Sequence, residues 1–549
     1  MATNKAVSKA PVKTVKKAPA KTAAKAPAKV AKAAPSTPAK KAPVKTPVKT
    51  AVKAAVKVPA KPEKKSTAKV AVKAPVKPAA KEPAKAAAKA PAKAATKAPA
   101  KAPVKAAAKA PAKTAVSADK KATSKPAAKT TVTTKTTTTT TTTTIPVTEN
   151  LPAPTPMAGA NQPVDWMLAF KFNSNIWPGC DDNGTVPAAG SPGLFGGTVR
   201  TYKEHSQNYI YASSANPALV KGTGCLGATL TDPLGATFNQ VYNTPGYYYV
   251  AWNDQFYNNP IKNEDSPMGH AKGMVAWNDN GEGFVLQVST PSWPGSLSKE
   301  HPRAVDGNTL GCMNDDDIEV SQHFFALKIN HADLCIILKA LGNASVATNR
   351  AQSSIFNNGG PADVQALANA LGSESNSTTC TVDTLSSGVQ IISKPSKMQV
   401  PPWQMVSAKL GSVPLRVASW WAAPFIGSTK AGEIPGCWAP GLGTPGAVEI
   451  AKSGTWNGQS IGLTGGDGED FNHAKIGIST DPSKPLCIFG DMNQQGALCT
   501  NYAYQGQQCD SSQNGRGGTF YVLNNSGLCS GLTDLLKGNS SDPDVNPNK

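Results

Sequence analysis

The sequence predicts a mixed α/β globular protein that follows a long disordered tail. All ten cysteines and every aromatic residue lie at or after Trp166, so only this later part can bury a packed core. Short apolar runs bounded by Gly, Pro, Asn or Asp are typical of strands. Residues 321–341 carry apolar side chains at helical spacing behind a serine, which predicts a helix. From residue 145 to 549 the chain is long enough for a large core in two lobes.

The tail is basic and interrupted by proline. Up to Thr144 the chain holds 35 Lys, no Arg and three acidic residues, so its formal charge is +32, whereas the remainder carries −10. Proline in units such as KAPAK and KAPVK cuts any Ala/Lys helix after one or two turns, and repulsion between lysines extends the chain. Residues 1–135 are therefore predicted to be a disordered DNA-binding tail, since dense positive charge displaces the counterions of a polyanion. A solubilising spacer is the alternative.

The tail composition resembles the C-terminal tails of linker histones and the Lys/Ala/Pro tracts of histone-like proteins. A threonine run and a Pro-rich sequence at 136–162 predict a linker, and order is expected to begin near Pro163. The N-terminus lacks the apolar core of a secretory signal, and no apolar run reaches the length of a membrane span. Such a tail suits a nucleoid, a nucleus or a virion, but the sequence assigns no compartment.

The ten cysteines are dispersed and include no CxxC pair. Structural zinc is therefore not expected. An even, dispersed set favours several disulfides formed in an oxidising place, with reduced core thiols as the alternative.

Two of the six histidines stand in the same tripeptide, His-Ala-Lys, each time before an apolar, strand-like run. His270 and Lys272 belong to GHAKGMVAW, and His473 and Lys475 belong to NHAKIGIST. Residues two apart in a strand point to one face, so each motif presents an imidazole and an ammonium together. Lysine can neutralise a phosphate oxygen, while histidine can attack phosphorus or protonate the leaving oxygen. The repeated pair predicts a phosphodiesterase site, with two surface histidines as the alternative.

Eight segments occur in the order expected of deoxyribonuclease II, and the sequence is similar to that family from Pro163 to Leu535. The segments are QPVDWMLAFKF (162–172), YVAWNDQ (249–255), GHAKG (269–273), GFVLQVSTP (283–291), SWWAAP (419–424), FNHAK (471–475), CIFGDMN (487–493) and NGRGGTFYVL (514–523). Together GHAKG, the second HAK and GDMN are the most specific of them.

The resemblance implies a phospholipase D-like fold. In that fold two halves, each a mixed sheet flanked by helices, form a pseudo-dimer, and each half supplies one HxK motif. The resemblance also implies an endonuclease that needs no metal or other cofactor, favours acid, and leaves 3′-phosphate ends on DNA. By position, His270, Lys272, His473 and Lys475 would be the catalytic residues. One histidine would form a transient phosphohistidine and the other would protonate the departing 5′ oxygen.

Three further residues are supporting candidates. In GDMN, Asp491 could orient a catalytic ring and Asn493 could hold a phosphate oxygen, with plain turn residues as the alternative. Animal members of the family carry a histidine at the position of Val288, beside Gln287. Either Gln287 substitutes for it or the activity differs. A structural or exposed place is predicted for the remaining histidines, His205, His301, His323 and His331.

The predicted organisation beyond the linker has two halves. They are an N-terminal half at 163–345 and a C-terminal half at 401–535, with an unassigned connection at 346–400 and a flexible end at 536–549. DNA is the expected partner, both as substrate and as the polyanion bound by the tail, and neither membrane nor metal is expected. Histidine pKa values near 6.5 would let neutral and charged imidazoles coexist at mildly acidic pH, which suits an acidic compartment. The alternatives are a catalytically weak DNA-packaging protein and a phosphodiesterase acting on another ester.

Overall fold

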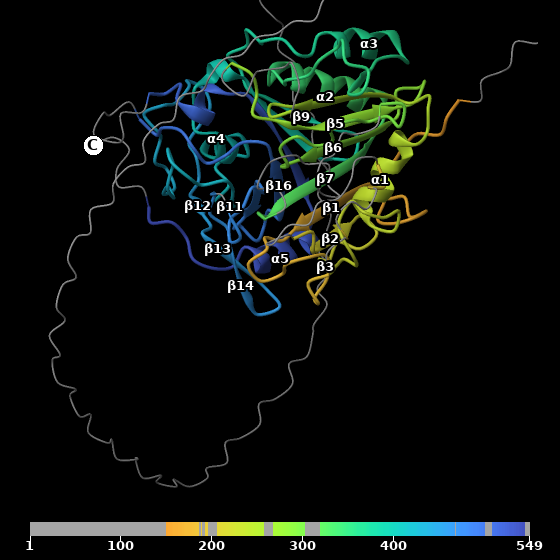
Figure 1. The fold of residues 1–549 in the computed structure, drawn as a ribbon. Helices are drawn as coiled ribbons and strands as arrows, with labels where there is room; N and C mark the ends of the chain where they lie inside the picture. The colour runs from red at the N-terminus through yellow and green to blue at the C-terminus, as the bar shows by residue number, and fades with distance from the viewer. Residues whose placement is uncertain are drawn as a thin grey trace, which may run out of the picture. The chain divides into compact units, whose positions relative to one another are not determined.

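The fold is a mixed α/β arrangement of two large sheets with few helices. The computed structural model describes residues 150–543 except for 186–187, 189–192, 196–205, 257–266, 302–318, 467 and 500–507. The predicted tail and His205 lie outside the described residues, as does the predicted linker up to residue 149. In Figure 1 the first sheet, orange to green, lies beside the second, cyan to blue.

The first sheet has eight strands in the order β3-β2-β1-β7-β6-β5-β4-β8, and all its neighbours are antiparallel. Its strands are β1 (Trp166–Lys171), β2 (Tyr209–Ser213), β3 (Val220–Lys221), β4 (Tyr248–Asn253), β5 (Lys272–Trp277), β6 (Gly283–Val288), β7 (Gln322–Ile329) and β8 (Phe356–Asn357). The strands predicted from GYYYVAWNDQ, GMVAWND and GFVLQVSTP are confirmed as β4, β5 and β6.

The second sheet has seven strands in the order β12-β11-β15-β16-β17-β10-β9, and only the pair β11–β12 is parallel. Its strands are β9 (Thr381–Thr384), β10 (Gln390–Lys394), β11 (Leu415–Ala418), β12 (Val448–Ile450), β15 (Ile476–Ser479), β16 (Leu486–Gly490) and β17 (Gly518–Asn524). A separate hairpin joins β13 (Ser453–Trp456) to β14 (Gln459–Gly462). The predicted strands at 474–480 and 485–493 are confirmed as β15 and β16.

The two sheets share a central order of five strands. The order β1-β7-β6-β5-β4 in the first sheet matches β10-β17-β16-β15-β11 in the second. The helices follow the same plan. In the chain α1 (Pro233–Tyr242) precedes β4 and α2 (His331–Asn343) follows β7, while α4 (Pro402–Lys409) precedes β11 and α5 (Ser526–Leu535) follows β17. The first HxK strand, β5, and the second, β15, therefore hold the same place in their sheets.

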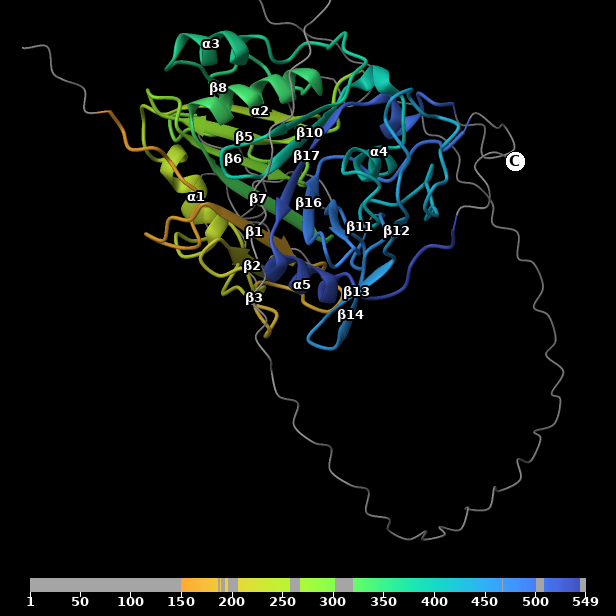
Figure 2. The same ribbon diagram turned by 180° about the vertical axis from the view of Figure 1, so that it is seen from behind.

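One hydrophobic core joins the two sheets. Phe325 of β7 stacks on Phe489 of β16 with ring centroids 4.3 Å apart, and Tyr521 of β17 lies 5.9 Å from the Phe325 ring. Helix α2 packs against β10 and β17 as well as β7, and α5 packs against β15 and β16, as Figure 2 shows from behind. Because burial of large aromatic side chains contributes strongly to stability, this shared core fixes one sheet against the other.

The helix predicted over residues 321–341 is only half right. Its first part is strand β7, whose residues are buried on both faces except Lys328, so the apolar run shows no clear alternation. The helix α2 begins after Asn330, whose side chain accepts from the Asp333 amide while the Asp333 side chain accepts from the Asn330 amide. This capping box, rather than the serine at 321, starts the helix.

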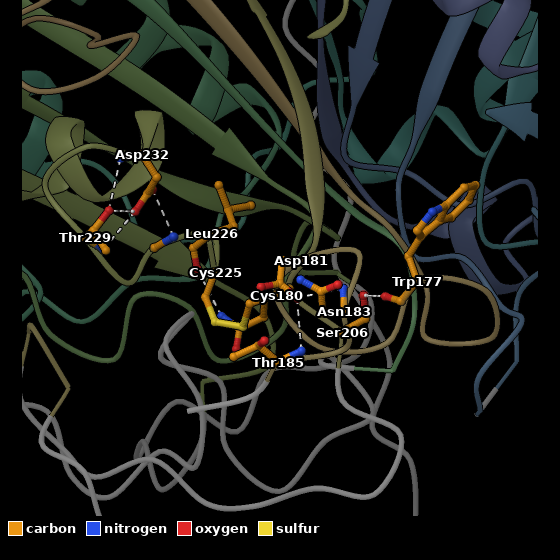
Figure 3. Close-up of a disulfide and its surroundings, with 12 residues drawn as sticks. Trp177, Cys180, Asp181, Asn183, Thr185, Ser206, Cys225, Leu226, Thr229 and Asp232 are labelled. Atoms are coloured by element: carbon orange, nitrogen blue, oxygen red, sulfur yellow. Dashed lines mark hydrogen bonds between the residues drawn. A yellow bond between two sulfur atoms is a disulfide. The ribbon is translucent and has the colours of Figure 1, made fainter. Parts of the chain in front are cut away.

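Disulfides are confirmed among the described residues. The pairs are Cys180–Cys225, Cys437–Cys509 and Cys487–Cys529. Figure 3 shows the first pair, which links the loop after β1 to the segment that leads into α1. Asp181 accepts two loop amides on one side of the bridge, and Asp232 caps α1 on the other. In the described part of the chain, no helix combines the length and apolar character that crossing a membrane requires.

Candidate active site

The two His-Ala-Lys motifs lie at the start of β5 and β15. Lys272 opens β5, and Lys475 directly precedes β15. His270 and His473 each stand two residues earlier. Both lysines and His270 are buried, and His473 is half-buried. All residues of β5 and β15 are buried. The packed strands therefore fix the positions of the histidines and lysines at their N-terminal ends.

Each motif is bonded to the chain of the opposite sheet. The main-chain amide of His270 donates to the carbonyl oxygen of Gly517 at 2.8 Å, and that of His473 donates to the carbonyl oxygen of Ser321 at 2.8 Å. Gly517 directly precedes β17, and Ser321 directly precedes β7. The two bonds are therefore equivalent and reciprocal.

A second reciprocal pair involves the lysine amides. The Lys272 amide donates to Asp491 Oδ1 at 3.4 Å, and the Lys475 amide donates to His323 Nδ1 at 3.1 Å. Asp491 follows β16 and His323 lies on β7, so each bond again crosses between the sheets. These contacts bring the two motifs, more than 200 residues apart in the chain, into one site.

The imidazoles of this site favour the neutral form. Burial lowers the pKa of His270 well below its usual range, and the charge of Lys272 lowers it further. Burial also lowers the pKa of His473 well below its usual range, with further lowering by Lys475 and Lys272. The electrostatic influence of each motif's lysine on the other motif's histidine agrees with their placement in one site.

The tautomer of His270 follows from its contact with Asp491. His270 Nδ1 lies 2.8 Å from the Asp491 carbonyl oxygen. Because a carbonyl can only accept, Nδ1 must carry the proton, and Nε2 of the neutral ring keeps its lone pair. Asp491 thus contacts His270 through its main-chain carbonyl, whereas the orienting role predicted for its carboxylate stays a prediction.

A buried chain of hydrogen bonds connects the two motifs. His323 Nδ1 accepts from Lys475, so its Nε2–H donates to Gln287 Oε1 at 3.0 Å. Gln287 Nε2 in turn donates to Asp491 Oδ1 at 2.9 Å, and Thr519 donates to Asp491 Oδ2 through both its amide and its hydroxyl. Burial lowers the pKa of His323 to about 3. This agrees with the neutral tautomer that the series of hydrogen bonds requires.

Burial raises the pKa of the Asp491 carboxyl to about 6, although the bonds from Thr519 and Gln287 oppose the rise. The Lys272 amide, the Gln287 side chain, and the amide and hydroxyl of Thr519 all donate to this carboxylate. The ionised form is therefore the one that satisfies all of them.

A buried ion-pair cluster holds the Lys272 ammonium. Asp254 accepts from Lys272 Nζ at 2.6 Å and from Arg516 Nη2 at 2.8 Å. Burial alone would raise the pKa of Asp254, but the charges of Lys272 and Arg516 outweigh it and hold the pKa well below its usual value. Arg516 also donates to the carbonyl oxygens of Met268 and Gly269, next to His270. Such a cluster orients the lysine and leaves two of its three protons for other acceptors.

The sequence around the first HxK motif is similar to a known protein family. Residues 195–434 match the family model described as deoxyribonuclease II. Over this range the sequence is similar to the deoxyribonuclease II family. The similarity indicates a hydrolase, and DNA is the substrate that the family implies. The matched range contains the first HxK motif and ends before the second. A search of curated proteins found no match.

Two buried lysines support the candidate site from equivalent positions. Lys171 ends β1 opposite Gln322 of β7, and Lys394 ends β10 opposite Gly518 of β17. Lys171 Nζ donates to the Phe172 and Val320 carbonyls.

Lys394 Nζ donates to the Pro395, Asn514 and Arg516 carbonyls. The residues after Val320 and Arg516 are Ser321 and Gly517, whose carbonyls hold the two histidine amides. Burial lowers the pKa of Lys394 to about 7, so the ammonium with its three donors prevails in acid.

The remaining candidates differ in their surroundings. Asn493 Nδ2 donates to Gln495, and the Asn493 amide donates to Gln513, and neither partner belongs to an HxK motif. Val288 is buried in the core beside α1. Its neighbour Gln287 is the one that enters the site. The half-exposed Trp420, from SWWAAP, meets His473 edge-on with ring centroids 4.2 Å apart.

Of the histidines predicted to be structural or exposed, His301 and His331 are exposed or half-exposed, and His323 is structural but bonded into the site.

Four members of the site were not predicted from the sequence. Asp254, Arg516, Thr519 and Trp420 lie within segments that carry the family resemblance, WNDQ, NGRGGT and SWW. Position in those segments was the available signal, because no spacing rule places them near the motifs.

We expect His323→Gln to flatten the pH dependence of stability. With a pKa of about 3 in the folded protein and about 6.5 in the unfolded chain, only the unfolded chain binds this proton between those values. The free energy of unfolding should then fall as pH drops below about 6.5, by up to about 1.4 kcal/mol per pH unit for this group. Urea unfolding between pH 4 and 7 measures the slope. Asp491 contributes the opposite sign but is present in both proteins.

The matched control is His301→Gln, an exposed histidine that bonds Ser353. It should keep the wild-type slope. Identical slopes for all three proteins would contradict a neutral, buried His323.

Lys394→Met should destabilise the fold by about 3–5 kcal/mol, because it leaves buried carbonyls without a donor. Urea denaturation at pH 6 measures the loss. The control is Lys397→Met, three residues on and exposed, which should change stability by less than about 0.5 kcal/mol. Equal effects of the two substitutions would refute the role of the buried ammonium.

Proposed function

We propose that this protein is an endonuclease that hydrolyses DNA phosphodiesters through its paired HxK motifs, without a metal ion, and leaves 3′-phosphate ends. The observation that carries the proposal is the reciprocal bonding of the two motifs across the sheets. It supports one site with two imidazoles and two ammonium groups, the set that general acid and nucleophilic catalysis at phosphorus requires.

In the proposed reaction His270 is the nucleophile. Its Nε2 lone pair attacks phosphorus, a P–N bond forms, and the bond from phosphorus to the 5′ oxygen breaks. His473, protonated, gives its proton to the departing oxygen and is left neutral. It then takes a proton from water, whose oxygen attacks phosphorus, breaks the P–N bond and frees the 3′-phosphate. The bond from His270 Nδ1 to the Asp491 carbonyl supports this assignment, because it exposes Nε2 as the unprotonated nitrogen.

Lys272 and Lys475 would stabilise the charge that develops on the phosphate oxygens. Asp254 and Arg516 would fix the Lys272 ammonium, since electrostatic stabilisation depends on groups that are placed before the reaction. Gln287 would take the structural place of the histidine found in animal members, because it joins His323 to Asp491.

The shared strand order supports the further proposal that the sheets are two related halves of a phospholipase D-like pseudo-dimer. The ranges 163–345 and 401–535 hold β1 to α2 and α4 to α5, but β8 of the first sheet and β9 and β10 of the second lie in 346–400. The two proposed halves therefore extend into that connection.

Acid preference follows from the need for one protonated imidazole. Burial lowers the pKa of both histidines, so the free site holds neutral rings at neutral pH. A bound phosphodiester would raise the pKa of His473 by its negative charge, and lower pH would populate the charged acid further. Activity should therefore rise as pH falls from 7.5 toward 5.

We propose that the lysine-rich residues 1–135 tether this site to its substrate. The part of the chain beyond Thr144 carries −10 and would repel DNA, whereas the tail carries the compensating positive charge.

The central test is nicking of supercoiled plasmid in EDTA at pH 5 and pH 7.5. Wild type should nick, faster at pH 5. His270→Ala with His473→Ala should lose at least about three orders of magnitude of activity, because both imidazoles act on the reacting phosphate. His301→Ala should retain full activity. Gel retardation without nicking by the wild type would favour the packaging alternative. Turnover of a small phosphodiester alone would favour another ester substrate.

DNA affinity should depend steeply on salt through the tail. If about ten lysines engage phosphates, log affinity falls against log salt with a slope near −9. Fluorescence anisotropy with a duplex between 50 and 300 mM salt measures this slope for the full chain and for a chain that starts at residue 145. An unchanged slope after truncation would show that the tail does not bind DNA.

A further inference from the structure

We propose that His331, Cys335 and Asp363 form a binding site for a zinc-class divalent ion that bridges helices α2 and α3 (Ala362–Asn369). The site is separate from the HxK motifs and from their chemistry. Nothing in the proposed nuclease reaction uses these three residues.

The three side chains converge from two helices. His331 and Cys335 are four residues apart at the start of α2, so they lie on one helix face. Asp363 lies in the first turn of α3, which packs against α2. The ligand atoms of all three lie within 4.8 Å of one another.

The distances between the ligand atoms suit a tetrahedral ion. His331 Nε2 lies 3.0 Å from each oxygen of Asp363, and Cys335 Sγ lies 3.5 Å from Asp363 Oδ2. Ligands at bond lengths of about 2.0–2.3 Å around tetrahedral zinc stand roughly 3.3–3.8 Å apart, so small side-chain shifts would admit the ion. Imidazole, thiolate and carboxylate are all zinc ligands, and the thiolate favours zinc over magnesium or calcium.

The surroundings leave room for the ion and for a water ligand. His331 and Cys335 are half-exposed and Asp363 is exposed, whereas Leu334 and Leu338 of the same helix face the core. Gly281 packs beside His331, where an added Cβ would lie 3.1 Å from the ring. Three protein ligands and one open position describe a surface site that solvent can fill.

Binding involves no redox change. The Cys335 thiol loses its proton to solvent as the sulfur bonds to the ion. Because the ion replaces that proton, affinity should increase with pH.

Cobalt titration of the full-length, reduced protein at pH 7.5 tests the proposal. One equivalent of Co²⁺ should give the intense visible spectrum of a tetrahedral ion, with a thiolate charge-transfer band. The charge-transfer band should vanish in Cys335→Ser, the spectrum should weaken in His331→Ala, and both should persist in the control His301→Ala. A weak octahedral spectrum, or one unchanged by Cys335→Ser, would overturn the site.

Alkylation supplies a readout on the unaltered chain. Saturating Zn²⁺ should slow iodoacetamide labelling of Cys335 by about tenfold or more. Cys499, another free cysteine of intermediate exposure outside the cluster, should react at an unchanged rate. Equal rates at Cys335 with and without Zn²⁺ would contradict the proposal. Plasmid nicking in EDTA reports separately on the nuclease site, so either proposal can fail alone.

Discussion

The site depends on reciprocal main-chain bonding between the two sheets. Each HxK motif donates the amide of its histidine to a carbonyl just ahead of a strand in the other sheet, and the amide of its lysine to a side chain there. Because these bonds run through the main chain, they do not occupy the side chains of the histidines and lysines. Neither sheet could place its own motif alone. The stacked Phe325 and Phe489 rings hold the sheets at the separation these bonds need.

This arrangement buries several charged side chains, and ion pairs and hydrogen bonds compensate for their loss of hydration. Asp254 forms ion pairs with both Lys272 and Arg516, while Lys171 and Lys394 donate to carbonyl groups. These carbonyls belong to the segments that receive the histidine amides. Burial, together with the positive charge of the nearby lysines, lowers the pKa of both imidazoles and favours neutral rings in the free protein. The positive charge would also favour a bound anion, so anion binding would be coupled to protonation of the rings.

Much of the fold could be predicted from the sequence, because strands bounded by glycine and proline carry local signals. The strands β4, β5, β6, β15 and β16 all follow such signals. The helix predicted over 321–341 was wrong in its first part. A strand that is buried on both faces shows no alternation of apolar and polar residues, and this strand leads directly into a helix. The repetition of the HxK tripeptide was enough to single out these residues, and their catalytic role stays a prediction. Asp254, Arg516 and His323 could not be predicted, because their partners lie far along the chain and only tertiary packing brings them together.

A crystal structure with vanadate, an analogue of the pentacoordinate phosphorus, tests the central claim most directly. The account predicts one vanadate between the rings, with His270 Nε2 bonded to vanadium, His473 on the opposite side, and the Lys272 and Lys475 ammonium groups on its oxygens. Vanadate bound elsewhere, or two rings too far apart to reach one ion, would contradict the shared site.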